Sequence, residues 1–208
     1  MKNVFHNVVK DFGEEWDKFN YSDNKTENLY LFNKYFDIFP KNKFNYKNLN
    51  CLDVGCGSGR WAKILAKKVK HITLLDPSIK ALNVAKKNLT NVKNVKFINK
   101  SVGDMNFKKK FDFIYSLGVL HHIPDVNGAI KMIAKNLKKG KPFLIYLYYN
   151  LDNKPLYYKI VWKLSEFIRA IVSKLPFKIK YYICNLIAVF VYYPLSLLAK
   201  GMKFLRFK

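Results

Sequence analysis

The stretch Cys51-Leu-Asp-Val-Gly-Cys-Gly-Ser-Gly-Arg60 decides the fold of this 208-residue chain. It joins a short apolar strand to a helix that begins near Trp61, through three glycines in the spacing G-x-G-x-G, namely Gly55, Gly57 and Gly59. Glycine permits a turn with positive φ and lets backbone N–H groups approach a ligand, while the helix directs its positive end at the same point. The stretch therefore predicts a ligand site between strand and helix, with Asp53 placed to face a ligand's ammonium group.

The position of Arg60 argues against one class of glycine loop. A dinucleotide-binding loop has the spacing G-x-G-x-x-G/A, in which the third small residue lets the helix pack closely. That third place falls on Arg60, whose long side chain would block such packing. The loop is therefore not expected to hold a dinucleotide.

Apolar, β-favouring runs alternate with helical patterns after this loop. Strands are predicted at 71–75, 95–99, 111–117 and 141–148. One helix is predicted from Ser78 to about Asn88, and its apolar stripe consists of Ile79, Leu82, Val84 and Ala85. Another is predicted from Ala129 to Lys138, closed by Gly140 as a C-cap glycine. The alternation predicts an α/β fold with a doubly wound, mostly parallel sheet.

Polar residues fall at the ends of the predicted strands. Each of four lies at or just beyond a strand's carboxyl end: Asp53, Asp76, Asp104 and Ser116. Ligands of such sheets bind at this edge, where the strand order reverses. Asp76 also follows the glycine loop by about 20 residues, a distance at which an acid accepts the hydroxyls of a ribose. A ligand site at this edge is therefore predicted.

Three runs carry a resemblance to a known family. They are the acid-led loop Asp53-Val-Gly-Cys-Gly-Ser-Gly59, the run Tyr115-Ser-Leu-Gly-Val-Leu-His-His-Ile-Pro-Asp125, and the narrower run Tyr146-Leu-Tyr-Tyr-Asn-Leu-Asp-Asn-Lys-Pro155. In these runs the chain resembles class I S-adenosylmethionine-dependent methyltransferases, and within them a methyltransferase type 11-like bacterial subgroup. The resemblance covers roughly residues 12 to 198. It implies a Rossmann-like core, S-adenosyl-L-methionine as cofactor, and no metal.

The resemblance also implies roles along the cofactor. Asp53 would orient the methionyl ammonium, Asp76 would bind the ribose, and Asp104 would bind the adenine amine beside the Met105 backbone. Arg60 would reach the carboxylate or point to solvent. Cys56 is expected to be a small filler of the loop rather than a nucleophile. The expected cofactor-binding residues are Asp53, Gly55, Cys56, Gly57, Gly59, Arg60, Asp76, Pro77, Ser78, Asp104, Met105, Ser116 and Leu117.

His121 and His122 stand where a methyl acceptor would enter. One of them is a candidate general base, because imidazole titrates near neutrality. The alternative is a structural histidine that caps the loop before Pro124. Methyl transfer from a sulfonium is an in-line displacement in which positioning supplies much of the acceleration, so few catalytic side chains are needed.

Three regions are expected along the chain. Residues 1–48 form a helical cap with aromatic side chains at helical spacing, at 12–19 and again at 29–39. In that cap, Phe12 and Trp16 either close over the methyl donor or pack on the sheet edge. Residues 49–150 form the cofactor-binding core, and residues 151–208 form a basic, hydrophobic helical region.

The end of the core departs from the family pattern. A seven-stranded methyltransferase sheet closes with an antiparallel hairpin after the fifth strand, and no such hairpin is evident after Tyr148. The closing strands are therefore expected to be lost, or the chain to be a fragment or a truncated product. An exposed edge on the fifth strand would then favour poor solubility.

A pair of hydrophobic helical segments is expected after the core. Residues 157–175 form a basic amphipathic helix that Pro176 ends, and residues 181–199 carry no charge. The second segment is just long enough to cross about 30 Å of hydrocarbon, although Asn185 and Pro194 lower its hydrophobicity. Three arrangements stay open: a monotopic hairpin in the membrane interface, a lid packed on the core, and a true span.

The composition limits the classes of molecule that the chain is expected to bind. The formal net charge is +24, and half of the residues are hydrophobic, which excludes general disorder. Such a charge attracts nucleic acid or anionic membranes, although a nucleotide-biased genome would also produce it. Ser116-Leu-Gly118 replaces the Asn/Asp-Pro-Pro-Tyr/Phe turn by which the family holds a base amine, so nucleic acid is less favoured. Three cysteines without metal spacing, and no secretion signal, indicate a reducing cytosol.

The predicted function is methyl transfer from S-adenosylmethionine to a small-molecule or lipid-linked acceptor. The predicted location is the cytoplasm, with peripheral contact to the inner face of the cytoplasmic membrane through residues 157–200. The alternatives are an RNA methyltransferase and a truncated, catalytically inactive cofactor-binding protein attached to membranes. The acceptor atom and the oligomeric state are not determined by the sequence.

Overall fold

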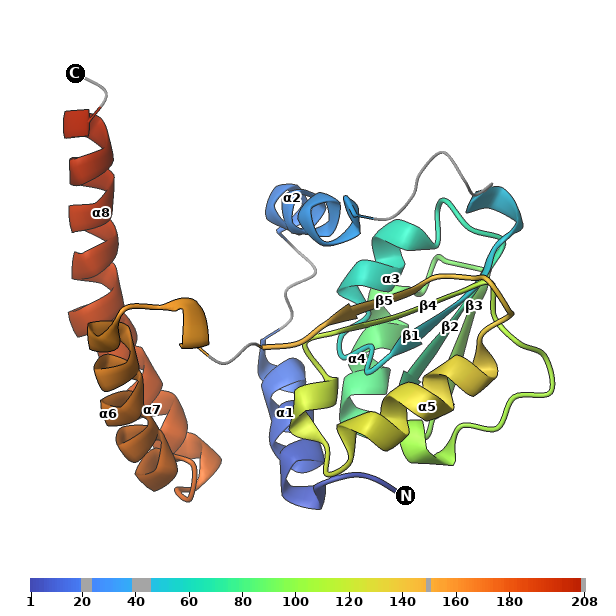
Figure 1. Cartoon of the computed structure of the whole chain (residues 1–208), viewed down its shortest axis with the longest axis horizontal. Helices are drawn as coiled ribbons and strands as arrows, with labels where there is room; N and C mark the ends of the chain where they lie inside the picture. The colour runs from blue at the N-terminus through green and yellow to red at the C-terminus, as the bar shows by residue number, and fades with distance from the viewer. Residues whose placement is uncertain (20–23, 39–45, 149–150, 207–208) are drawn as a thin grey trace. The chain divides into compact units, whose positions relative to one another are not determined.

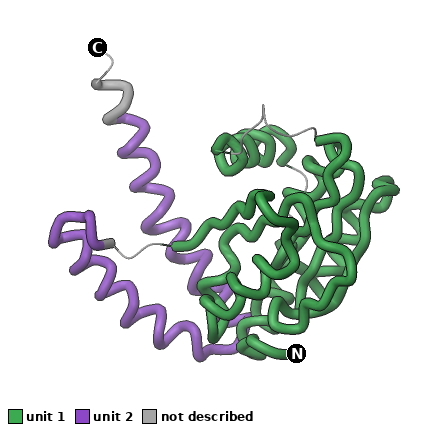
Figure 2. The backbone as a smooth tube through the Cα atoms, turned by 45° about the vertical axis from the view of Figure 1, so that its right-hand side comes forward, with its two compact units in different colours: residues 1–148 green, residues 149–208 purple. Residues whose placement is uncertain are grey.

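The computed structural model describes residues 1–19, 24–38, 46–148 and 151–206. The chain forms two compact units, residues 1–148 and residues 149–208, which are called the first and second unit below (Figure 2). Each unit is described by itself. Phe39 and Asn150, which belong to a predicted helix and to one of the family-like runs, lie outside the described residues.

The first unit is built on a five-stranded parallel sheet (Figure 1). The strand order is β3-β2-β1-β4-β5, so the order reverses between β1 and β4. The strands are β1 (Asn50–Val54), β2 (His71–Asp76), β3 (Val95–Asn99), β4 (Phe113–Leu117) and β5 (Phe143–Tyr146). The predicted Rossmann-like, doubly wound class is confirmed. No strand follows β5 within residues 151–206.

Helices cover both faces of this sheet (Figure 1). The helices are α1 (His6–Lys18), α2 (Lys25–Phe36), α3 (Arg60–Leu65), α4 (Ile79–Asn88) and α5 (Val126–Asn136). Alternation along β1 separates two cores: Cys51 packs with residues of α2, α3 and α4, whereas Leu52 and Val54 pack with α5. Helix α1 packs against α4, which places it beside the carboxyl end of the sheet.

Local interactions correct several predicted boundaries. Helix α5 begins at Val126 because the Asp125 carboxylate accepts a hydrogen bond from the Gly128 N–H at 2.8 Å, and it ends at Asn136. Gly140 has φ +74° but lies beyond the helix end rather than capping it. The chain leaves the helix early because Leu137 forms a parallel bridge with Phe111. In this bridge the Phe111 N–H donates to the Asn136 carbonyl, and the Lys138 N–H donates to the Phe111 carbonyl.

Two further expectations are wrong in detail. Ile79, expected in the apolar stripe of α4, is 54% exposed, and the buried stripe consists of Ala81, Leu82, Val84 and Ala85. Strand β5 spans Phe143–Tyr146 rather than residues 141–148, because the turn closed by the Lys141 N–H and the Lys138 carbonyl occupies its expected start.

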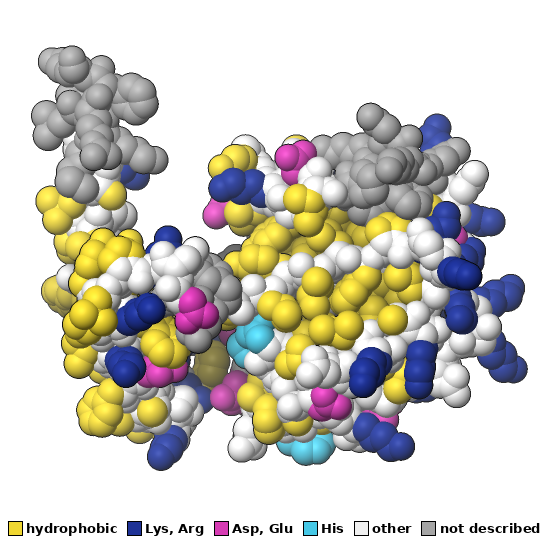
Figure 3. Space-filling model, viewed as in Figure 1, with side chains coloured by type: hydrophobic (Ala, Val, Ile, Leu, Met, Phe, Trp, Pro, Cys, Tyr) yellow, Lys and Arg dark blue, Asp and Glu magenta, His cyan; other side chains and the backbone are white. Residues whose placement is uncertain are grey.

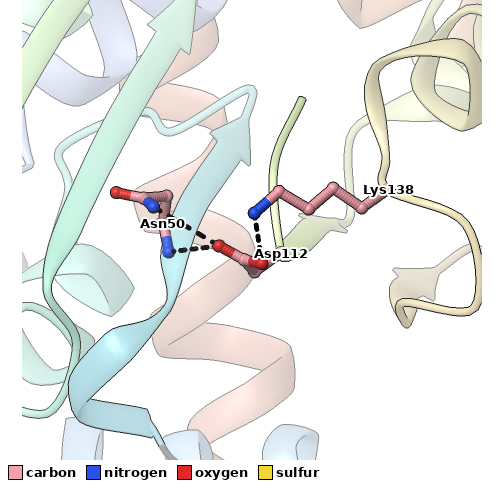
Figure 4. A network of polar contacts seen from close by, with 3 residues as sticks. All are labelled: Asn50, Asp112 and Lys138. Atoms are coloured by element: carbon pink, nitrogen blue, oxygen red, sulfur yellow. Dashed lines mark hydrogen bonds and ion pairs between the residues drawn. The ribbon is translucent and has the colours of Figure 1, made fainter. Parts of the chain in front are cut away.

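The buried carboxylate of Asp112 links the amino ends of neighbouring strands (Figure 4). Asp112 accepts hydrogen bonds from the Asn50 N–H at 3.0 Å and from Lys138 Nζ at 2.8 Å. Burial alone would raise the pKa of Asp112, but the bonds from Lys138 and Asn50 outweigh it and hold the pKa below its usual value. The network links β1, β4 and the approach to β5 at the edge opposite the predicted site.

The second unit is helical. It contains the short turn Leu151–Asn153, α6 (Leu156–Val172), α7 (Phe177–Ile187), a π-helical turn (Ala188–Tyr192) and α8 (Tyr193–Arg206). Pro194 explains the π-helical turn, since proline lacks an N–H and its ring clashes with the carbonyl four residues earlier. The predicted stop at Pro176 is slightly late, because α6 ends at Val172 and Pro176 caps α7.

The second unit exposes its apolar side chains. Figure 3 shows hydrophobic side chains along these helices, and Leu164, Phe167 and Phe190 are 64%, 70% and 72% exposed. Within the continuous helical stretch Phe177–Gly201, an 18-residue window has a mean hydropathy of 1.8, and none of that window is buried within the structure. By length and composition alone, this one stretch of the described residues is able to cross a membrane.

Candidate functional site

The glycine loop between β1 and α3 has the backbone that the sequence predicts. Gly55, Gly57 and Gly59 have φ values of +76°, +52° and +71°. At Gly57 a side chain is also excluded by space, because a Cβ atom would lie 2.8 Å from Cε2 of Trp16. Gly57 therefore lets the indole of α1 lie directly on the loop, while its N–H is directed at the neighbouring strand.

Asp76 anchors this loop. Its carboxylate accepts hydrogen bonds from the Gly57 N–H at 2.9 Å and from the Ser78 N–H at 2.8 Å. Burial raises the pKa of Asp76 to about 6, even though both N–H donors oppose the rise. The acid thus holds the loop to the end of β2 and borders the adjoining cavity.

Asp53 lies at the end of β1 and is 2% exposed. Tyr115, its partner across the β1–β4 ladder, donates its hydroxyl to Oδ2 of Asp53 at 2.8 Å. Burial raises the pKa of Asp53 to about 8; the Tyr115 hydrogen bond opposes this rise, and the nearby Asp76 adds to it. Asp53 is therefore largely protonated at neutral pH, and a bound cation would favour its ionised form.

A cavity of about 130 Å³ opens at the carboxyl ends of β1, β2 and β4. It lies at the point where the strand order reverses, which is where sheets of this kind bind ligands. Ten of the predicted site residues border it: Asp53, Gly55, Cys56, Gly57, Arg60, Asp76, Pro77, Ser78, Leu117 and His122. The structure therefore brings most of the predicted set together.

The N-terminal segment and α1 supply the apolar roof of this cavity. Its lining from this side consists of Val4, Phe5, Val8, Val9, Phe12 and Trp16. Phe12 meets His122 edge-on with ring centroids 5.0 Å apart. Of the two arrangements expected for Phe12 and Trp16, the structure has the one that covers the cavity.

Arg60 borders the cavity and lies over two aromatic rings. Its guanidinium lies 4.2 Å from the ring centroid of Trp61 and 5.7 Å from that of Trp16, as in a cation–π contact. Burial raises the pKa of Glu15, and the charge of Arg60 partly offsets this rise. Arg60 thus joins α1 to α3 beside the cavity.

Asp104 and Met105 do not border the cavity. Asp104 accepts hydrogen bonds from Ser101 Oγ at 2.7 Å and from the Lys2 N–H at 3.1 Å. The Ser101 hydrogen bond lowers the pKa of Asp104 most. Met105 is 3% exposed and packs in the core beneath α5. The N-terminal residues cover this corner of the first unit. The Lys2 N–H binds the Asp104 carboxylate, which was expected to face a ligand.

Asn3 fastens the same N-terminal segment to the loop before α5. Its Nδ2 donates to the Asp125 carbonyl at 2.7 Å, and its Oδ1 accepts from the Asp125 N–H at 2.8 Å. Nothing in the sequence marks Lys2 or Asn3 as neighbours of the site, because their partners lie about a hundred residues away along the chain.

Two other predicted residues are absent from the lining of the cavity. Ser116 Oγ donates to the Val54 carbonyl at 2.9 Å and is fully buried. Gly59 begins α3 and packs against Leu89 and Leu74 rather than bordering the cavity. Tyr115, by contrast, was missed as a site residue, although a side chain at this point of β4 is on the same sheet face as Asp53.

The two histidines face different surroundings. His122 borders the cavity, and burial lowers its pKa to about 4, with the neighbouring His121 adding to the effect. His121 stacks on Tyr148 with ring centroids 4.0 Å apart. Within the described part of the chain, neither ring nitrogen of His121 has a hydrogen-bond partner, although both are buried. Burial lowers the pKa of His121 as well, so both rings are neutral at pH 7.

Aromatic rings continue from His121 along the ends of β4 and β5. Tyr148 meets Tyr146 edge-on at 6.1 Å, and Tyr146 meets Tyr35 of α2 at 5.1 Å. Tyr146 and Tyr148 are 40% and 67% exposed. This aromatic wall is open to an incoming planar molecule. Among the described residues, no group of His, Cys, Asp and Glu side chains is arranged to hold a metal ion.

Known proteins share this fold and parts of this sequence. The chain is 33% identical over 97 residues to a ubiquinone biosynthesis O-methyltransferase of Pelagibacter ubique (strain HTCC1062), covering 45% of this chain and 40% of that protein. It is 28% identical over 138 residues to a demethylmenaquinone methyltransferase of Staphylococcus aureus (strain MRSA252), covering 64% of this chain and 57% of that protein. The chain thus spans between 40% and 57% of the length of these two relatives.

A solved structure shares the fold at lower identity. The N-methyltransferase NodS of Bradyrhizobium japonicum WM9, in complex with S-adenosyl-L-homocysteine, superposes with a TM-score of 0.55 at 19% identity, covering 67% of this chain and 72% of that one. A family model described as a methyltransferase domain matches residues 45–186, which is more than half of the chain. The chain therefore belongs to the class I methyltransferases, a family whose cofactor is S-adenosylmethionine.

Proposed function

We propose that this chain binds S-adenosylmethionine in the cavity beneath α1 and transfers its methyl group to a small-molecule acceptor. The observation that carries the proposal is the pairing of two buried acids, Asp53 and Asp76, beside a positive-φ glycine loop at the switch point of the sheet. One acid suits an ammonium group, and the other, held by two N–H donors, suits the hydroxyls of a ribose.

The apolar roof suits the reaction itself. A sulfonium loses its positive charge during methyl transfer, so a site that excludes water does not need to stabilise new charge at the sulfur. Phe12 and Trp16 of α1 close the cavity from above. The main contribution of the protein is then to hold donor and acceptor in line.

We place the acceptor on the side of His121 and the aromatic wall, Tyr35, Tyr146 and Tyr148. A neutral imidazole with unpartnered nitrogens accepts a proton or a hydrogen bond from an acceptor hydroxyl, which makes His121 the better candidate base of the two histidines. A planar ring stacks on exposed tyrosines. Two relatives named for ubiquinone and menaquinone support a quinone-type, lipid-linked acceptor.

We further propose that the second unit attaches the protein to the inner face of the cytoplasmic membrane. Residues 149–208 contain eleven Lys and Arg against two acidic residues, Asp152 and Glu166. Exposed apolar residues alternate with these charges along α6, a pattern suited to an anionic interface. Attachment would bring the site to a lipid-linked acceptor.

Calorimetry with S-adenosylmethionine tests the cofactor site first. Wild type is expected to bind, Asp76→Ala to lose most of the affinity, and Asp17→Ala, an exposed acid on α1, to bind like wild type. Absence of binding by the folded wild type would overturn the proposal.

Transfer of a labelled methyl group to a hydroquinone, compared with transfer to RNA, tests the acceptor. Methylation of RNA alone would favour the RNA methyltransferase alternative, and binding without any turnover would favour the inactive one. His121 is the proposed base, whereas His122 borders the cofactor cavity. His121→Gln is therefore expected to lower kcat with a quinol acceptor more than His122→Gln does.

Flotation with vesicles tests the membrane contact. The full chain is expected to float with phosphatidylglycerol-containing vesicles more than with phosphatidylcholine vesicles. Leu164→Asp combined with Phe167→Asp removes two exposed apolar side chains of α6 and is expected to reduce flotation. A wild-type chain that stays off both kinds of vesicle would refute the attachment.

A further inference from the structure

Tyr115 lies outside the cavity yet reaches the acid that borders it. Its ring is fully buried, and it packs edge-on against Phe36 of α2 at 5.4 Å and beside Phe113 of β4 at 5.7 Å. These contacts fix the ring from the core side. Its hydroxyl then has a defined position, 2.8 Å from Oδ2 of Asp53.

The arrangement restricts the carboxylate of Asp53. Asp53 and Tyr115 are paired residues of adjacent parallel strands, so their side chains are on the same face of the sheet. One carboxylate oxygen is occupied by the hydroxyl, which leaves the other available to a ligand in the cavity that Asp53 borders. A carboxylate held in this way presents a fixed direction to a cation, without the entropy cost of ordering a free side chain.

We propose that Tyr115 is a positioning residue for the amino acid part of the cofactor, because its hydroxyl orients the carboxylate of Asp53. The inference rests on the proposed cofactor site. It assigns a function to a buried tyrosine whose ring is otherwise part of the core.

The charge state of Asp53 gives the inference a distinctive signature. Three groups face this carboxyl: Tyr115 from β4, Asp76 from β2, and Cys56 from the glycine loop. Among the described residues, the Tyr115 hydroxyl alone opposes the burial that favours the neutral acid, whereas Asp76 adds to it. Removing this hydroxyl therefore moves ionisation of Asp53 to higher pH, and a ligand ammonium loses its partner at neutral pH.

The test is Tyr115→Phe, which removes one oxygen atom and keeps the ring. Two probes are compared by calorimetry: S-adenosylhomocysteine, which carries the ammonium group, and 5′-methylthioadenosine, which lacks the amino acid part. At pH 7 the variant is expected to bind the first probe roughly 10- to 100-fold more weakly, the range expected for a hydrogen bond to a charged group. It is expected to bind the second probe with unchanged affinity, which also shows that the site is folded.

A pH series from 6 to 8.5 separates positioning from packing. Wild-type affinity for S-adenosylhomocysteine is expected to rise with pH and to level off near the pKa of Asp53, about 8. The variant's affinity is expected to keep rising through this range. Tyr30→Phe, which removes an exposed tyrosine hydroxyl of α2 away from the cavity, is expected to follow wild type.

Two results would overturn the inference while leaving the cofactor site intact. One is an equal loss for both probes, and the other is a variant pH profile that matches wild type. Failure of wild type to bind either probe would instead remove the proposed function on which the inference rests.

Discussion

The contact between Gly57 and Trp16 allows the loss of folding stability caused by one added methyl group to be worked out. Gly57→Ala places a Cβ atom 2.8 to 3.0 Å from three atoms of the Trp16 indole. Gly57 also has φ +52°, and a non-glycine residue in this left-handed region costs roughly 1–2 kcal/mol. Displacing a packed side chain typically costs a further 1–3 kcal/mol or so. We expect Gly57→Ala to destabilise the first unit by about 2–5 kcal/mol in all.

A control separates the two contributions. Gly118 has φ +75°, and among the described residues other than its two chain neighbours, no atom lies within 4 Å of the place where its Cβ would be. Gly118→Ala therefore tests backbone strain alone, and we expect it to cost about 1–2 kcal/mol. The difference between the two variants then reports the contact with Trp16.

A double-mutant cycle provides the decisive measurement. Urea unfolding is followed by fluorescence of the buried Trp61, with Trp162→Phe as the common background. In the presence of Trp16→Ala, the extra cost of Gly57→Ala over Gly118→Ala is expected to vanish, a coupling of about 1–3 kcal/mol. Effects of Gly57→Ala and Trp16→Ala that add within about 0.5 kcal/mol would show that α1 does not rest on the loop, and the roof of the site would have to be abandoned.

Three other predictions follow from particular contacts. A folded-state pKa of about 8 for Asp53, against an ordinary 3.8, means that wild-type stability falls as pH rises from about 4 to about 8, because the unfolded carboxyl releases its proton first. The contribution of Asp53 to this loss is at most roughly 6 kcal/mol; Asp53→Asn is expected to remove this contribution and so reduce the slope in unfolding experiments, and an unchanged slope would contradict the raised pKa. Asp112→Ala leaves the Asn50 N–H and Lys138 without their partner and is expected to lower the free energy of unfolding by about 1–3 kcal/mol at pH 7. Because the pKa of Asp112 is lowered, this destabilisation should shrink as the pH falls below about 4, and an equal destabilisation at pH 7 and pH 3 would contradict the lowered pKa. Pro194→Ala is expected to convert the π-helical turn at Ala188–Tyr192 to regular α-helix, visible as amide protection and chemical shifts in micelles, whereas persistence of the wider turn would show that Pro194 is not its cause.

Much of the fold was predictable because its signals are local. The glycine loop, the acid-ended strands and the alternation of strand and helix each depend on neighbours within about ten residues, and the predicted 95–99 strand matches β3. Helix ends were less predictable. The end of α5 at Asn136 depends on the bridge between Leu137 and Phe111, a partner distant in the sequence.

The site likewise has a part that was predictable from local sequence and a part that was not. Asp53, Asp76 and the glycines follow from their positions at strand ends, and the structure brings them to one cavity. Asp104 follows the same pattern but lies elsewhere, since the Lys2 N–H and Ser101 occupy its carboxylate. Strand position alone does not show which acid another segment will cover.

The sequence by itself therefore determined the class of protein, the parallel sheet and the edge at which the site forms, because glycine conformation and hydrophobic period are properties of short segments. Only the tertiary structure decided that α1 roofs the cavity, that Arg60 lies on Trp61, and that Tyr115 holds Asp53. Those contacts join residues far apart along the chain, and the burial that shifts the pKa values of the two acids exists only after the sheet and its covering helices have packed.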